Sequence, residues 1–395
     1  MKIREISLLL LVAILYFGCA PIRAIRWWQP DLNDSSKFAK ATIQKSNLPF
    51  RFIDATGNAR YQKLNNHLDS MLESSNTNAF LVIKNDSIIY EKFAGNLNKN
   101  SLHPSFSVAK SYIGTLVGIA IDKGIIRSAE DLVIKYFPEL ERNDARFKKL
   151  TIQHVLDMQS GFDFNEDRAS PFAGITRLYY GASLNRELGK LKMKSEPGKA
   201  FEYQSINTQL LSAILERASG EKITTLLATY LWTPLGTESD AIWSLDDKKT
   251  AKAFCCLNAT ATDFAMLGRL YLKKGNWEGK QLLSESWINS TTSPEALTKQ
   301  GYKNQWWACN NISYFKDSLS AQKAMTNLKL DLPIHKMKNG TYYFRQKVYD
   351  YRAEGILGQI VYVNPDNNVI IVRMGGYPAK NIYFNGFIPK IGRGL

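Results

Sequence analysis

The hydrophobic pattern predicts β-strands near both ends of the chain and helices between them. Residues 79–95, with the sequence AFLVIKNDSIIYEKFAG, hold two β-rich runs separated by turn-forming residues and so predict a β-hairpin. Three further β-rich runs lie at 340–351, 355–365 and 368–376, and residues 364–368 (NPDNN) predict the tight turn between the last two. We expect one antiparallel sheet built from both ends of the chain.

A long apolar helix is predicted for residues 107–124. Its apolar positions recur at helical spacing on nearly every side, which is typical of a buried helix, and Gly124 follows as a stop signal. The middle of the chain, roughly 125–340, is interpreted as helices and loops. We therefore expect a two-lobed α/β (α+β) fold, in which helices flank the antiparallel sheet and a mostly helical second lobe is inserted, with a crevice between the lobes.

The first 19 residues have the pattern of a signal peptide. Lys2 and Arg4 precede a 12-residue apolar run at 6–17, which is too short for a typical membrane-spanning helix. Cys19 follows a small residue, as in a lipobox, so we expect a lipid-anchored membrane protein that faces the periplasm or the cell exterior. An uncleaved anchor and plain secretion are the alternatives. Residues 20–65 are interpreted as a tether and cover, which leaves 66–395 as the main domain.

Composition and charge narrow the class of partner. The 395-residue chain is 45% hydrophobic, enough for a large core, and carries a formal net charge of +15. Such a charge favours anionic partners, but the basic residues are scattered and no helix-turn-helix, zinc-finger or RNP-type motif is present. We expect a basic, solvated surface and no nucleic-acid partner.

The cysteines predict neither a disulfide framework nor a zinc site. If Cys19 is lipidated, Cys255, Cys256 and Cys309 remain, and this odd number leaves at least one free thiol. Adjacent cysteines can hardly bridge each other, so a bond from Cys309 to one of the pair is the only disulfide that we consider feasible. No zinc-binding spacing is present.

Ser107 and Lys110 are the first candidates for chemistry. A serine needs a nearby base to act as a nucleophile, and residues three apart on a helix share a face. Burial in an apolar helix would favour the uncharged amine, and the helix N-terminus supplies N–H groups for an oxyanion. Three other Ser-x-x-Lys matches, at Ser219, Ser313 and Ser320, lie in a helix-ending turn or in polar stretches and are attributed to chance. The alternative for Ser107 is an ordinary helix N-cap.

A second candidate segment is Tyr203-x-Ser205-x-Asn207, which precedes an amphipathic helix. A phenol whose pKa is lowered by cationic neighbours can carry a proton from the nucleophile to the leaving group. Ser205 and Asn207 could steady the lysine or a substrate amide. The alternative is a loop with Asn207 as the helix cap.

A third candidate is the glycine-containing strand at 355–363. Gly355 and Gly358 inside a predicted strand suggest that another chain or a ligand approaches closely. Such an edge could offer a backbone N–H that completes an oxyanion hole with the N–H of Ser107. A β-bulge is the alternative.

Two more segments are interpreted as structural rather than as parts of a site. Residues 163–167, which include Glu166, are interpreted as a solvated acidic loop, and residues 305–307 (QWW) as core packing, although both could line a cleft.

Over about residues 60–375 these features together resemble the serine β-lactamase and penicillin-binding-protein superfamily. The connecting phrases LTIQHVLDMQSGFDFNED and TATDFAMLGRLYL look most like the class C β-lactamase-like branch, which includes esterases and 6-aminohexanoate-oligomer hydrolases. The resemblance implies that Ser107 is acylated, that Lys110 takes its proton and that Tyr203 is the acid/base. It places Ser205 at the second position of the tyrosine motif and Ile356 as an oxyanion donor, and it implies no metal and no cofactor.

One departure from the family pattern bears on the substrate. The strand that usually carries Lys/His-Thr/Ser-Gly, which grips a substrate carboxylate, reads DYRAEG here (350–355), and Arg352 is the available substitute. We therefore expect a cell-envelope serine hydrolase that cleaves an ester or amide bond of a small molecule through an acyl-serine. The alternatives are a β-lactamase or D,D-peptidase, and a non-catalytic penicillin-recognition-type binding protein.

Overall fold

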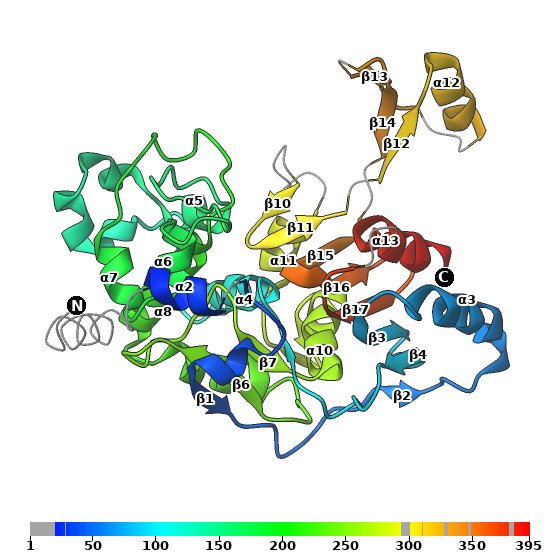
Figure 1. The fold of residues 1–395 in the computed structure, drawn as a ribbon, viewed down its shortest axis with the longest axis horizontal. Helices are drawn as coiled ribbons and strands as arrows, with labels where there is room; N and C mark the ends of the chain where they lie inside the picture. Colours follow the sequence, from blue (N-terminus) through cyan, green and yellow to red (C-terminus); the bar gives the residue numbers. More distant parts are fainter. Residues whose placement is uncertain are drawn as a thin grey trace, which may run out of the picture.

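The computed structural model describes residues 20–27, 29–293, 301–309, 311–327, 331–337, 339–346, 349–378 and 383–395. Within these residues the chain forms two lobes, with helix α4 (Val108–Asp122) between them (Figure 1). One lobe is built on a large sheet, and the other is mostly helical. This arrangement confirms the expected two-lobed mixed fold.

The large sheet joins strands from both ends of the chain. Its eight strands follow the order β10-β11-β15-β16-β17-β3-β4-β2, and only the β2–β4 pair is parallel. Strand β17 lies between β16 and β3, so the C-terminal strands pair directly with the N-terminal hairpin β3–β4, as predicted. The strands are β2 (Ile53–Asp54), β3 (Thr77–Lys84), β4 (Ser87–Phe93), β10 (Tyr302–Lys303), β11 (Trp306–Ala308), β15 (Tyr351–Gly355), β16 (Gln359–Asn364) and β17 (Val369–Gly375).

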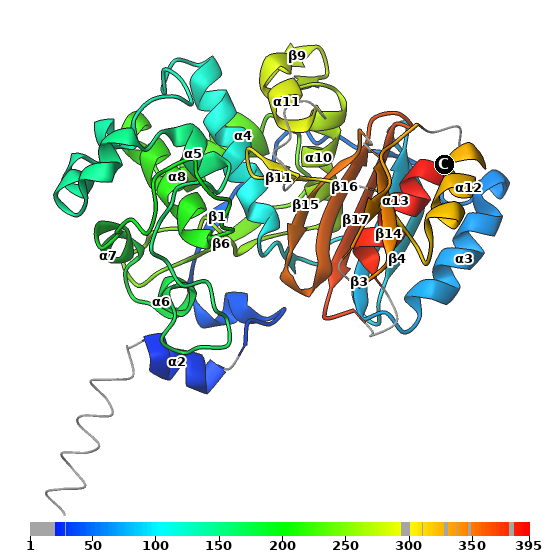
Figure 2. The same ribbon diagram turned by 90° about the horizontal axis from the view of Figure 1, so that it is seen from above.

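Helices cover both faces of this sheet because side chains alternate along each strand. Phe80 and Val82 of β3 share a buried cluster with α3 (Gln62–Leu72) and α13 (Phe384–Gly394). Leu81 belongs to the other cluster, which contains α4 and α10 (Ala261–Leu272). Figure 2 shows α3 and α13 on the side of the sheet away from α4. Helix α4 therefore lies in the core between the lobes, with every residue from Val108 to Ala120 buried.

The second lobe contains more β-structure than its sequence pattern predicts. Its helices are α5 (Ile152–Leu156), α6 (Gly174–Tyr180), α7 (Leu184–Gly189), α8 (Ser205–Ser219) and α9 (Ile223–Leu227). A four-stranded sheet in the order β1-β6-β7-β5 accompanies them, with β1 (Ala39–Ile43), β5 (His103–Pro104), β6 (Ala241–Leu245) and β7 (Leu257–Ala259). These strands have at most five residues, too few for a period-2 pattern to stand out.

Residues 20–65, interpreted as a tether and cover, contribute strands to both sheets. Strand β1 pairs with β6 over five residues, and β2 extends the large sheet beside β4. Helix α2 (Ala20–Trp27) packs against α6 (Figure 2). The segment thus contributes to both lobes. No helix in the described part of the chain is both long and apolar enough to span a bilayer.

The run at 340–351, predicted as one strand, is divided between two sheets. Strand β14 (Tyr342–Gln346) lies between β12 (Asn311–Phe315) and β13 (His335–Lys336) in a small sheet that projects from the large one, together with α12 (Ser318–Asn327) (Figure 1). Strand β15 lies in the large sheet. Strands β8 (Asn276–Trp277) and β9 (Lys280–Gln281) and helix α11 (Glu285–Thr292) precede β10.

Candidate active site

Ser107 stands at the start of α4, directly after a strained turn. Phe106 has a φ of +41°, in the left-handed region that non-glycine residues rarely adopt. Ser107 occupies the N-cap position, yet its side chain makes no capping hydrogen bond. Its Oγ accepts a hydrogen bond of 2.9 Å from Lys110 Nζ instead. The hydroxyl therefore serves the lysine contact rather than the helix end.

Lys110 is buried, and its environment opposes a charge. The side chain is about 1% exposed, and Nζ also donates to the carbonyl of Phe254 at 2.8 Å. Burial lowers the pKa of Lys110 to about 7; the carboxylate of Glu166 opposes this shift, and the guanidinium of Arg168 adds to it. About half of these amines are therefore neutral at pH 7.

Tyr203 completes a three-residue cluster. Lys110 Nζ lies 5.3 Å from the centre of the Tyr203 ring, and the Ser107 side chain is close enough to the Tyr203 hydroxyl to influence its pKa. Burial raises the pKa of Tyr203 well above its usual value, and the Ser107 contact only partly opposes this. The expectation of a phenol whose pKa is lowered by cations was wrong, because desolvation outweighs them; the phenol keeps its proton at neutral pH.

Trp307 supports the tyrosine from the large sheet. Its indole stacks on the Tyr203 ring at 5.6 Å, with 25° between the planes. The neighbouring Trp306 is fully buried, as core packing predicts, while Trp307 is only partly buried. The strand β11 thus fixes the phenol through one face of its ring.

Glu166 holds the start of α8 and was missed by the sequence analysis. Its carboxylate accepts from the Ser205 N–H at 2.9 Å and from the Ser205 hydroxyl at 2.6 Å. A carboxylate at a helix N-terminus satisfies free N–H groups and favours the helix dipole. The acidic loop is therefore not merely solvated. The local Ser-x-x-Glu pattern that would reveal a helix cap is absent from α8, because its capping carboxylate comes from a remote segment.

Asn207 is not the helix cap, and no described contact joins it to the lysine; its predicted contact with a substrate amide stays a prediction. Helix α8 begins at Ser205, so Asn207 lies within its first turn. The buried amide donates to the carbonyl of Gln204 at 3.2 Å, and its Oδ1 has no hydrogen-bond partner among the described residues. The cap position is taken by Gln204.

Gly355 brings the strand against the Ser107 turn. A Cβ at this position would lie 2.6 Å from the Ser105 oxygen and 3.0 Å from the Ser107 nitrogen, so only glycine fits without a shift. The predicted close approach is confirmed, and the approaching chain is the turn itself. Gly358 is not in a strand, because β15 ends at Gly355. A turn in which Leu357 and Gly358 have left-handed backbone angles leads into β16. This turn excludes the predicted β-bulge.

A pocket of about 290 Å³ opens beside Ser107. Ser107, Ser205 and Ile356 line it, together with Phe254. Further lining residues are Ala24 and Ile25 of α2, the loop residues 168–171, and Ile175, Tyr179 and Tyr180 of α6. The wall formed by α2 was not predicted, because nothing local in residues 20–30 indicates a ligand.

Tyr203 faces a different space. It lines a separate groove with Asp163, Glu166, Asp167 and Glu202, and this groove contains none of the residues of the pocket just described. The pocket and the groove therefore share no lining residue.

Arg352 does not take the place of the family's carboxylate-binding residue. Its guanidinium donates to Glu354 at 2.8 Å and to the sulfur of Cys309 at 3.3 Å, and it does not line the pocket. The side chain is therefore occupied within the sheet.

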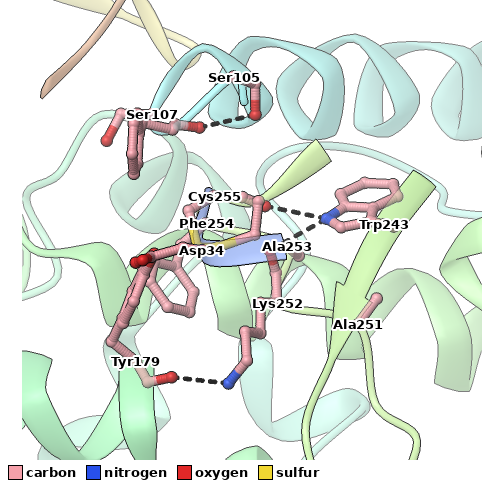
Figure 3. The surroundings of a disulfide bond; sticks show 12 residues. Asp34, Ser105, Ser107, Tyr179, Trp243, Ala251, Lys252, Ala253, Phe254 and Cys255 are labelled. Carbon is pink, nitrogen blue, oxygen red and sulfur yellow. Dashed lines mark hydrogen bonds between the residues drawn. A yellow bond between two sulfur atoms is a disulfide. The ribbon is translucent and has the colours of Figure 1, made fainter. Parts of the chain in front are cut away.

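Cys255 and Cys256 form a disulfide, which corrects the expectation that neighbouring cysteines do not bridge (Figure 3). Cys256 has a φ of +71°, and this left-handed turn lets adjacent side chains meet. The bond follows Phe254, whose carbonyl binds Lys110, and Cys255 lines the pocket. Trp243 Nε1 donates to the Cys255 carbonyl at 2.9 Å, while Cys309 is a buried free thiol.

The described residues contain no group of three His, Cys, Asp or Glu side chains placed to hold a metal ion. Cys19 lies outside the described residues.

Comparison with known proteins identifies the family. A family model described as Beta-lactamase matches residues 65–375. A 6-aminohexanoate-dimer hydrolase of Paenarthrobacter ureafaciens is 32% identical over 267 residues, covering 62% of this chain and 67% of the relative.

Solved structures share the fold. One from Bacillus anthracis, which carries the provisional name 6-aminohexanoate-dimer hydrolase, has a TM-score of 0.74 at 21% identity and covers 94% of both chains. EstCE1, a hydrolase with promiscuous acyltransferase activity, has a TM-score of 0.56 at 16% identity and covers 80% of this chain and 92% of its own. The family model spans most of the length of this chain. The chain therefore belongs to the beta-lactamase family and is a serine hydrolase of the amidase or esterase type.

Proposed function

We propose that this hydrolase cleaves its ester or amide substrate through a covalent acyl-enzyme on Ser107. The observation that carries the proposal is the contact of 2.9 Å between the Ser107 hydroxyl and a lysine amine whose burial favours the neutral form. A neutral amine can accept the hydroxyl proton as the oxygen attacks the carbonyl carbon. Lys110 then carries the proton, and Ser107 carries the tetrahedral intermediate.

Collapse of this intermediate requires a proton for the leaving group. Tyr203 is protonated at neutral pH and lies close to Ser107, so it is placed to deliver one, and Lys110 can reprotonate it. Water then attacks the acyl-serine with the same groups in reverse order. The N–H groups of Ser107 and Ile356, residues that both line the pocket, are the proposed oxyanion donors.

Esters and amides are favoured over β-lactams as substrates. A relative that is 32% identical to this chain is named 6-aminohexanoate-dimer hydrolase. Arg352, the substitute for the lysine that grips a lactam carboxylate, is tied to Glu354. We therefore place this chain with amidases and esterases rather than with β-lactamases or D,D-peptidases.

A fluorophosphonate probe tests the acyl-enzyme directly. We expect wild-type protein to be labelled and Ser107→Ala to remain unlabelled, with Ser219→Ala as the matched control for a chance Ser-x-x-Lys match. No labelling of the wild type would instead support the non-catalytic binding protein, and equal labelling of Ser107→Ala would place the nucleophile elsewhere. Turnover of p-nitrophenyl esters with slow turnover of nitrocefin is expected; the reverse would favour a β-lactamase.

We also propose export to the cell envelope with a lipid on Cys19. The support is the basic start, the 12-residue apolar run and the position of Cys19 after a small residue. Metabolic labelling with palmitate should be lost in Cys19→Ser and retained in Cys309→Ser. Retention of the label in Cys19→Ser would exclude this anchor.

A further inference from the structure

The pocket beside Ser107 offers one unpaired charge to a substrate. Its apolar walls suit a hydrocarbon chain. Arg168 lines it, and its positive charge reaches Lys110 and Tyr203 strongly enough to influence both. In the described part of the chain no carboxylate pairs with Arg168, whereas nearby Arg177 is bound to Glu187 at 3.0 Å. No carboxylate lines the pocket either.

The loop that carries Arg168 is fixed on both sides. Glu166 is bound to Ser205 at the start of α8, and the Ser170 carbonyl accepts from the Thr176 hydroxyl at 2.7 Å. Ala169 N–H donates to Asp167 at 3.0 Å. The guanidinium therefore projects from a held backbone, as a specificity-determining group should.

We assign the pocket beside Ser107 and the groove lined by Tyr203 to different parts of the substrate. The proposed proton donor, Tyr203, lines the separate groove, so the leaving group belongs there. The pocket holds Ser107 and Ile356, the residues proposed to bind the carbonyl, and so receives the acyl chain. This assignment rests on the proposed function.

We propose that Arg168 selects acyl chains that end in a carboxylate, so that the preferred substrates are half-esters or half-amides of dicarboxylic acids. A guanidinium matches a carboxylate in geometry and charge. The same pocket disfavours an acyl chain that ends in an amine, because a cation would meet Arg168 and find no acid among the residues that line it.

The test compares p-nitrophenyl half-esters of glutarate, adipate and suberate with the same esters capped as methyl esters, and with an amine-ended ester of equal length. The readout is the ratio of kcat/KM for the carboxylate-ended ester to that for its methyl-capped partner. This ratio cancels any effect of Arg168 on Lys110, since both esters use the same lysine. We expect a ratio above one in the wild type, largest at one chain length, and the lowest kcat/KM for the amine-ended ester.

Arg168→Ala should lower the ratio about fivefold and Arg168→Glu about tenfold or more, since Arg168 is exposed and an exposed pair is weaker than a buried one. High salt should lower the wild-type ratio. Lys280→Glu, in the remote β8–β9 hairpin (Figure 2), makes the same charge change as a control and should leave the ratio unchanged. A ratio near one in the wild type, or one unaffected by both Arg168 variants, overturns this inference while leaving the proposed function intact. No fluorophosphonate labelling of the wild type overturns both, whereas a labelled protein that hydrolyses none of these esters overturns this inference alone.

Discussion

The ionisation of Lys110 gives the sharpest prediction about this enzyme. Its burial moves the pKa from 10.5 to about 7, which corresponds to about 5 kcal/mol against protonation. A solvent-exposed lysine would be neutral in roughly one molecule in 3,000 at pH 7, whereas about half of the Lys110 side chains are neutral. Because the folded-state pKa is lowered, the neutral base is present above pH 7 and is lost as the pH falls below it.

The assay is kcat/KM for p-nitrophenyl acetate between pH 5 and 9. We expect an acid limb with a midpoint near pH 7 and about a tenfold loss for each further pH unit. Glu166 raises and Arg168 lowers the pKa of Lys110, so Glu166→Gln should move the limb to lower pH and Arg168→Gln to higher pH. A wild-type profile that is flat across this range, or variants that both move the limb in one direction, would refute the reasoning.

Three further predictions concern the residues around Ser107. Tyr203→Phe should lower kcat by about 10²–10⁴-fold in ester hydrolysis, and unchanged turnover would remove Tyr203 from the mechanism. Glu166→Ala should lower the free energy of unfolding in urea by about 1–2 kcal/mol, because the Ser205 N–H loses its cap; a stability equal to wild type would contradict this role. Gly355→Ala should abolish fluorophosphonate labelling, since its Cβ would displace the Ser107 turn, whereas Gly189→Ala, with open space around it, should label normally. Normal labelling of both would contradict the close approach.

Local patterns predicted the elements whose burial follows from their own sequence. The hairpin β3–β4, the turn between β16 and β17 and the buried helix α4 all match, because period-2 and helical repeats report which faces are covered. The contact between Ser107 and Lys110 was likewise local, since three residues on a helix fix their separation.

The rest of the site depends on segments far apart in the chain. Glu166 reaches Ser205 across 39 residues, and the Phe254 carbonyl reaches Lys110 across 144. The hydrophobic periodicity of these segments does not predict such long-range contacts. The disulfide was excluded on the assumption of an ordinary backbone, and the left-handed φ of Cys256 is a property of the folded loop. Tyr203 was misjudged because counting nearby charges says nothing about desolvation.

The bond between neighbouring cysteines ties the lining of the pocket to the compartment in which the chain matures. It immediately follows the carbonyl that holds the Lys110 amine, so two thiols in its place would leave that carbonyl on a freer loop. Thiols persist in the reducing cytosol and are oxidised in the bacterial periplasm. Protein produced in the cytosol and protein produced in the periplasm therefore differ next to the reacting atoms. Kinetic constants measured on one preparation do not transfer to the other.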